Sequence, residues 1–117
     1  DELLPHADVL SLHCLLTDET RDLIGARELK MMKPDSLLIN TSRGGLVNEQ
    51  ALADALRAGE IGGAGFDVLT EEPPRNGNPL LADDIPNLIM TPHSAWASRE
   101  ARQRIVDITA QNLASIL

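Results

Sequence analysis

Three ionisable side chains, an Arg, a Glu and a His, each follow a short apolar stretch of this sequence. Arg43 comes shortly after residues 37–39, Glu72 follows the stretch that ends at Leu69, and His93 follows residues 88–90. Ligands of open parallel α/β sheets bind at the carboxyl ends of the strands, so polar side chains at these places need a chemical explanation. An Arg, a Glu and a His in such positions indicate an acid/base site.

The stretches that would position these side chains alternate between strand and helix patterns. We expect strands at residues 8–13, 36–40, 61–69 and 88–90, since strands of a parallel sheet are apolar on both faces. We expect helices at residues 19–24, 26–32 and 48–58, and a final helix that reaches Leu117. This order predicts an α/β fold that is half of a doubly wound parallel sheet.

Several of the expected boundaries carry local chemical signals. Asn48 is a good N-cap for the third helix, and Gly59 stands just beyond the end of that helix. Residues 71–86 hold four prolines and are expected to form a long surface loop. The final helix is capped by Ser94 or Ser98. Its apolar residues are expected to face inward: Ile105, Ile108, Leu113 and Ile116.

Composition sets limits on the function. The 117 residues fit one domain, and eighteen acidic against ten basic residues give a formal charge of −8. Nucleic acids and anionic membranes would need a basic patch, so neither is an expected partner. No apolar stretch approaches the roughly twenty residues of a membrane span, and the first residues lack a signal-peptide pattern. Cys14 is the single cysteine, which favours a reducing, cytoplasmic setting.

Short motifs along essentially the whole chain resemble those of a known family. They are Pro5-His6-Ala7-Asp8-Val9, Ser11-Leu12-His13, Met32-Lys33-Pro34, Asn40-Thr41-Ser42-Arg43-Gly44, Gly65-Phe66-Asp67-Val68, Glu72-Pro73, Asn78-Pro79-Leu80 and Thr91-Pro92-His93. Together they resemble the D-isomer-specific 2-hydroxyacid dehydrogenases. Residues 94–101 are most similar to the glycerate dehydrogenase, or hydroxypyruvate reductase, branch of that family.

The resemblance implies a Rossmann-like dinucleotide-binding domain and hydride transfer between NAD or NADP and C2 of a small 2-keto or 2-hydroxy acid. Hydroxypyruvate/D-glycerate and glyoxylate/glycolate are the expected substrate pairs. By analogy Arg43 would hold the substrate carboxylate, because a guanidinium can bind it bidentately. His93 would give a proton to the carbonyl oxygen and take it back in the reverse direction. Glu72 would orient His93 and favour its charged form.

The resemblance also implies residues that meet the cofactor, and no metal. Asp67 matches the position that meets the nicotinamide end, and six more residues belong to the expected cofactor site: Cys14, Thr41, Ser42, Arg43, His93 and Ser94. Cys14 is expected to line the cofactor side as a small residue, because no base or cationic partner that would make its thiol reactive is evident nearby.

Several of these residues could also have a purely structural role instead of a functional one. Before the family is considered, Arg43 fits a solvated residue in a turn, and Glu71 competes with Glu72 as the functional carboxylate. His6 is expected at the surface, and His13 is expected to stabilise the end of a strand. Trp96 either walls the substrate pocket or only packs.

The glycine fingerprint that cradles a pyrophosphate is absent from this chain. Gly63-Ala64-Gly65 opens like it, but Val68 stands where the third glycine is needed, and the motif lies inside an expected strand. We therefore expect residues 1–117 to be the C-terminal part of an NAD(P)-binding domain, without most or all of the substrate domain. A half sheet exposes a strand edge and apolar faces, which predicts association or a homo-oligomer. The alternative function is a non-catalytic cofactor-sensing or partner-binding module.

Overall fold

A parallel sheet forms the centre of the molecule. The computed structural model describes residues 1–116, within which the sheet has four strands: β1 (Val9–Leu12), β2 (Leu37–Asn40), β3 (Gly63–Phe66) and β4 (Leu88–Met90). They are hydrogen-bonded in the order β1-β2-β3-β4, and every neighbouring pair is parallel. This confirms the predicted α/β fold with strands close to the expected positions.

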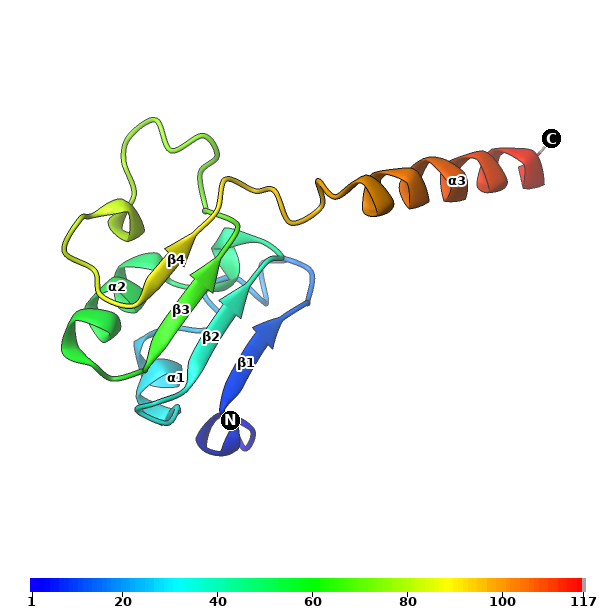
Figure 1. Ribbon diagram of the computed structural model, residues 1–117. Helices are drawn as coiled ribbons and strands as arrows, with labels where there is room; N and C mark the ends of the chain where they lie inside the picture. The colour runs from blue at the N-terminus through cyan, green and yellow to red at the C-terminus, as the bar shows by residue number, and fades with distance from the viewer. Residues whose placement is uncertain (117) are drawn as a thin grey trace.

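One face of the sheet is covered by helices α1 (Ala26–Met31) and α2 (Glu49–Ala58), which lie behind it in Figure 1. Leu38 of β2 is fully buried on this face, as are Leu29 of α1 and Leu52 of α2. The ends of α2 are set as the sequence predicts, because the Asn48 side chain accepts the Ala51 N–H and Gly59 adopts a left-handed conformation with φ 67°.

The opposite face of the sheet is open within the described residues. Val9, Leu37 and Ile89 point to this side and are 58%, 42% and 71% exposed. A Cβ on Gly63, at the start of β3, would lie 2.9 Å from the carbonyl oxygen of Asn87, so that glycine serves the close approach of neighbouring backbone. The expected open apolar face is therefore present, and the Gly63-Ala64-Gly65 motif lies inside a strand.

The prediction of a helix at residues 19–24 is wrong. Residues 18–22 form turns, and Ile24 makes an isolated parallel bridge with Val47. The Thr20 hydroxyl accepts the N–H of Thr17 at 2.7 Å and donates to the carbonyl of Leu15 at 2.6 Å. Threonine side chains thus take the place of helical hydrogen bonds, as short polar side chains can in turns.

The final helix, α3 (Arg99–Ile116), extends away from the sheet toward the right of Figure 1. Ser98 is its N-cap, since its hydroxyl accepts the Ala101 N–H at 3.1 Å. The prediction that its apolar residues face inward is wrong: no residue of α3 between Arg99 and Ile116 is buried. The inward set was Ile105, Ile108, Leu113 and Ile116, whose exposed fractions are 57%, 48%, 59% and 81%. Leu117 lies outside the described residues.

Candidate active site

The strand ends bring the predicted site segments to one edge of the sheet. Asn40, Phe66 and Met90 are the last residues of β2, β3 and β4, and they pair with one another in register. The segments that follow them therefore leave the sheet side by side. Arg43 lies on the first of these segments and His93 on the last.

Glu72 and His93 are joined by a hydrogen bond. Glu72 Oε2 lies 2.5 Å from His93 Nδ1, and Glu72 Oε1 accepts the backbone N–H of Leu69 at 2.7 Å. Both carboxylate oxygens are thus engaged, so the Glu72 side chain is fixed between the start of its own loop and the imidazole. Glu71, the neighbouring carboxylate, instead lies 3.4 Å from the side-chain amide of Asn76.

The surroundings of Glu72 favour its ionised form. Burial alone would raise the pKa of this carboxyl, but the hydrogen bonds from His93 and from Leu69 outweigh burial, and the nearby charge of Arg43 acts in the same direction. The net effect is a Glu72 pKa below its usual value. A carboxylate hydrogen-bonded to Nδ1 holds the ring in one orientation.

Asp67 fixes the turn that carries His93. The residue is 3% exposed. Its Oδ1 accepts the hydroxyl of Thr91 and the Ser94 N–H (2.8 Å), and its Oδ2 accepts the Ala95 N–H at 2.8 Å. Burial would raise the Asp67 pKa, but these hydrogen bonds lower it further than burial raises it. His93 has φ 52°, a conformation unusual for a residue with a Cβ, and the hydrogen bonds on both sides of it hold that geometry.

Arg43 lies on a turn shaped by a buried asparagine. Asn40 is 0% exposed, its amide donates to the Arg43 carbonyl at 2.9 Å, and its Oδ1 accepts the Ser42 N–H at 3.0 Å. The Arg43 side chain is exposed, and its Nη1 donates to the Ser42 carbonyl at 2.7 Å. The guanidinium is therefore accessible to an anion at the same sheet edge as His93.

Two adjacent hollows share Asp67 and Thr91 as a common wall. The smaller, about 230 Å³, is lined by apolar Leu69, by Pro73, Pro74 and Pro92, and by Glu72 and His93. The larger, about 300 Å³, has an apolar floor that includes Ile39, Gly65 and Ile89, and a polar rim of Thr41 and Ser94. Such an arrangement suits a flat ring with a polar substituent in the larger hollow and a small substrate beside His93.

The other predicted cofactor residues lie close to these hollows without lining them. The Ser42 hydroxyl donates to the carbonyl of Cys14 at 3.0 Å, which ties together the segments after β1 and β2. Cys14, Ser42 and Arg43 line neither of the two hollows. The structure thus gathers Thr41, Asp67, His93 and Ser94 around the hollows and leaves these three beside them.

The remaining candidate residues have structural contacts. His13 is bonded through Nε2 to the Ser11 hydroxyl of β1 at 2.8 Å, in line with a role at the strand end. His6 is exposed. The indole N–H of Trp96 donates to the His93 carbonyl at 2.8 Å, and the residue is 54% exposed. Trp96 therefore adds a contact to the His93 turn, while it lines neither hollow.

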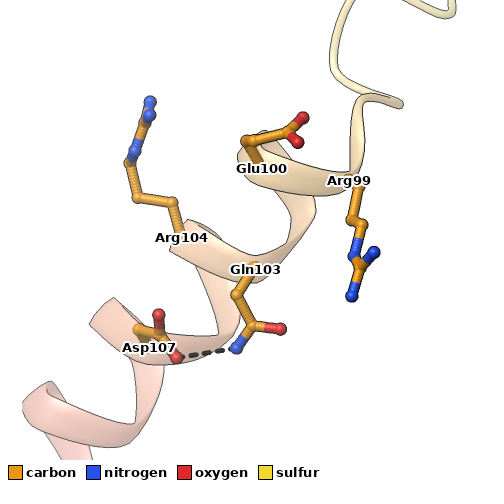
Figure 2. A pocket seen from close by; sticks show the side chains of 5 residues that line it. All are labelled: Arg99, Glu100, Gln103, Arg104 and Asp107. Atoms are coloured by element: carbon orange, nitrogen blue, oxygen red, sulfur yellow. Dashed lines mark hydrogen bonds between the residues drawn. The ribbon is translucent and has the colours of Figure 1, made fainter.

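A further hollow of about 450 Å³ lies on α3 and does not resemble a site. Its walls are side chains of one helix only: Arg99, Glu100, Gln103, Arg104 and Asp107. Figure 2 shows these polar groups spread along the helix, with Gln103 donating to Asp107 at 2.9 Å. No second segment faces them in that hollow, so this surface is the solvated face of a helix. Within residues 1–116, no three His, Cys, Asp or Glu residues are grouped to hold a metal ion.

Sequence reasoning missed two residues that assemble the site. A Cβ on Gly44 would lie 2.0 Å from the carbonyl carbon of Leu69, so only glycine lets the Arg43 segment touch the Glu72 loop. Glu49 of α2 accepts the N–H of Thr70 at 2.7 Å. Glu49 follows the N-cap Asn48 in the first turn of α2, and nothing in its spacing along the sequence indicated the contact with Thr70.

The family is shown by comparison with known proteins. Residues 1–95 match the family described as D-isomer specific 2-hydroxyacid dehydrogenase, NAD binding domain. This chain belongs to that family. Among family relatives, the chain is 54% identical over 113 residues to glycerate dehydrogenase of Methylorubrum extorquens, covering 97% of this chain and 36% of the relative. It is 44% identical over 117 residues to hydroxypyruvate reductase of Blautia hydrogenotrophica, covering 100% of this chain and 36% of the relative.

Solved structures of other proteins share the fold of this chain. An acyclic imino acid reductase (Bsp5) in complex with NADPH and D-Arg superposes with a TM-score of 0.87 at 39% identity. The match covers 98% of this chain and 36% of that one. The chain thus spans about a third of the length of the relatives that it matches. Within the described residues, none of the helices is long and apolar enough to cross a membrane.

Proposed function

We propose that the protein containing this chain transfers a hydride between NADH or NADPH and C2 of a small 2-keto or 2-hydroxy acid. Hydroxypyruvate/D-glycerate and glyoxylate/glycolate are the proposed substrate pairs, since relatives of this chain are named glycerate dehydrogenase, hydroxypyruvate reductase and glyoxylate reductase. The observation that carries the proposal is the 2.5 Å contact between Glu72 and His93 at the carboxyl ends of the strands, beside two adjoining hollows. These residues would form the C-terminal part of the dinucleotide-binding domain.

His93 is the proposed proton donor and acceptor. Because Nδ1 is held by Glu72, the proton exchanged with the substrate oxygen would be carried on Nε2. In reduction, the imidazolium gives this proton to the carbonyl oxygen as C2 receives the hydride, and it takes the proton back in the reverse direction. Glu72 keeps the ring oriented and stabilises its charged form during each cycle.

Arg43 is the proposed anchor for the substrate carboxylate. Its exposed guanidinium lies close enough to Glu72 to lower that carboxyl's pKa, so it lies near the proton donor. A bidentate contact would fix the orientation of C2, and such positioning is one way in which binding accelerates a reaction.

The residues of the larger hollow fit the nicotinamide end of a dinucleotide. When bound, this group supplies the hydride. Asp67 already accepts three donors, and a carboxylate has about four lone-pair directions, so one remains for an N–H of a ligand. Thr41 and Ser94 offer hydroxyls at the rim, and Ile39, Gly65 and Ile89 offer an apolar floor. We propose that Cys14, Ser42, Arg43 and His93 complete the cofactor side.

Substitution of His93 by alanine tests the assignment. We expect hydroxypyruvate-dependent oxidation of NADH or NADPH by the protein containing this chain to fall at least about 100-fold in His93→Ala, because the proton donor is lost. His6→Ala is the matched control and should keep full activity, since His6 is exposed and lies before β1. Retained activity in His93→Ala would contradict the role of His93. No activity in the unaltered protein would favour the non-catalytic cofactor-sensing or partner-binding alternative.

Two further expectations remain predictions. The open face and the outer edge of β1 favour association with another chain or a homo-oligomer, which light scattering would detect. A cytoplasmic setting is in keeping with the single cysteine, which is free.

A further inference from the structure

Glu49 ties together both sides of the loop that carries Glu72. Its Oε1 accepts the backbone N–H of Thr70 at 2.7 Å, and its Oε2 accepts the side-chain amide of Asn78 at 2.8 Å. Thr70 lies before Glu72 and Asn78 lies after it. A single carboxylate in the first turn of α2 therefore closes the base of this loop, as an acceptor-only group can do between two donors.

The groups that Glu49 holds are themselves connected to the site and to the core. The Leu69 N–H, one residue before Thr70, donates to Glu72. Asn78 Oδ1 accepts the Leu80 N–H at 2.9 Å, and Leu80 is 2% exposed. Displacement of Thr70 would thus move the neighbouring Leu69 N–H, which fixes Glu72. Asn78, the other partner of Glu49, is instead held by its hydrogen bond to the buried Leu80.

The segment that carries Arg43 is connected to the same place. Gly44 contacts the backbone of Leu69 and Thr70, where no side chain would fit. Glu49 follows Gly44 by five positions: Gly44 begins η2 (Gly44–Leu46), and Val47 and the N-cap Asn48 connect η2 to Glu49. Contacts from Gly44 and from Glu49 therefore meet at Thr70 and set the Glu72 loop against the Arg43 turn.

We propose that Glu49 is a positioning residue that sets Glu72 relative to His93 and Arg43. Glu49 acts through the backbone at Thr70 and through Asn78, and it has no contact with substrate. This inference rests on the proposed function for its kinetic consequence, whereas the contact between Glu72 and His93 can be observed without turnover.

Reversal of the hydrogen-bond polarity is the sharpest test. In Glu49→Gln, one acceptor oxygen is replaced by an NH2 donor. In one orientation this NH2 group faces the Thr70 N–H, and in the other it faces the NH2 group of Asn78. One of the two hydrogen bonds must therefore be lost. In the double variant Glu49→Gln/Asn78→Asp, the glutamine can accept from Thr70 and donate to the new carboxylate, which can still accept the Leu80 N–H. Glu60→Gln is the matched control, because Glu60 follows the same helix and its side chain forms no hydrogen bond within residues 1–116.

The kinetic measurement uses the protein containing this chain. We expect kcat with hydroxypyruvate to fall between about tenfold and a hundredfold in Glu49→Gln, while KM changes less than about threefold, because the acid/base pair is misplaced. The double variant should recover to within about threefold of the unaltered protein, and Glu60→Gln should match it. An unchanged kcat in Glu49→Gln, or a double variant no better than the single one, would overturn the inference.

The second measurement needs no activity and separates this inference from the proposed function. Nitrogen-15 NMR of the His93 ring in the 117-residue chain reports whether Nδ1 is hydrogen-bonded to Glu72. We expect the hydrogen-bonded signal in the unaltered chain, its loss in Glu49→Gln and its return in the double variant. A signal unaffected by Glu49→Gln would overturn the positioning role even if the enzyme is active. Absent turnover in the unaltered protein would instead refute the proposed function.

Discussion

The segment from Leu69 to Ala95 and helix α3 are both mostly exposed, yet they differ in how they are held. The segment makes regular structure only briefly, at η3 (Pro79–Leu81) and at β4. It is fixed at separate points by Asp67, Glu49 and a pair of hydrogen bonds between Arg57 and Asp84, both 2.8 Å. Helix α3 is fully regular over eighteen residues, and none of them is buried.

The difference shows that regular structure and fixed position are separate properties. The interior backbone groups of helix α3 bond to one another, so they need no partner from the sheet. The loop cannot do so, and its backbone groups are satisfied by side chains of other elements, such as the carboxylates of Asp67 and Glu49. Those side chains fix the positions of Glu72 and His93, which the proposed catalytic pair requires and which a lone helix cannot provide.

The largest effect on stability in this comparison is expected from Leu80, the one buried apolar side chain between Leu69 and Ala95. We expect Leu80→Ala to lower the free energy of unfolding by about 2–5 kcal/mol, because Leu80 is 2% exposed and its loss leaves a cavity. Leu81→Ala is the control: Leu81 is 48% exposed, so the change should stay within about 0.5 kcal/mol. Urea unfolding measures both. Equal effects of the two substitutions would show that the loop is not anchored through Leu80.

A smaller effect is expected from the carboxylate that fixes the His93 turn. Asp67→Asn should lower the free energy of unfolding at pH 7 by about 1–3 kcal/mol, because the buried charge accepts three hydrogen bonds. The pKa of Asp67 in the fold lies below its usual 3.8. Its ionisation therefore stabilises the fold above about pH 4 and loses that effect as the pH falls through the lowered value.

Urea unfolding at several pH values checks this dependence. The difference between the unaltered chain and Asp67→Asn should be constant between about pH 5 and 7 and should shrink below about pH 4. Asp83→Asn is the control, since Asp83 is exposed and should show no such difference. A difference that grows toward acid pH would mean that Asp67 is not held as a carboxylate.

Local sequence signals predicted the elements whose ends depend on neighbouring residues. Asn48 and Gly59 bound α2 as expected, and Ser98 caps α3. The helix expected at residues 19–24 failed because Thr17 and Thr20 hydrogen-bond with one another and with nearby backbone. Asp22 also adopts φ 51°, which is incompatible with a continuing helix. Hydrophobic spacing carries no information about such side-chain competition.

The candidate site was predictable in part. Strand ends located Arg43, Glu72 and His93, and the family resemblance supplied the roles that remain to be tested. Glu49 was not predictable, because its partners Thr70 and Asn78 lie 21 and 29 residues away. Such contacts depend on how the loop folds back over α2, which periodicity along one element cannot reveal. For the same reason, the apolar pattern of α3 identified a helix and could not specify what lies against it.

The smallest effect is expected on α3. Ile105→Ala and Ile108→Ala should each change the free energy of unfolding of the 117-residue chain by less than about 0.5 kcal/mol, because both side chains are about half exposed or more. Urea unfolding measures this against Leu80→Ala. A loss of about 2 kcal/mol or more would contradict the free position of α3, since it would require burial of these side chains. The dependence of that stability loss on protein concentration would then show whether Ile105 and Ile108 pack on the sheet of their own chain or on a second copy.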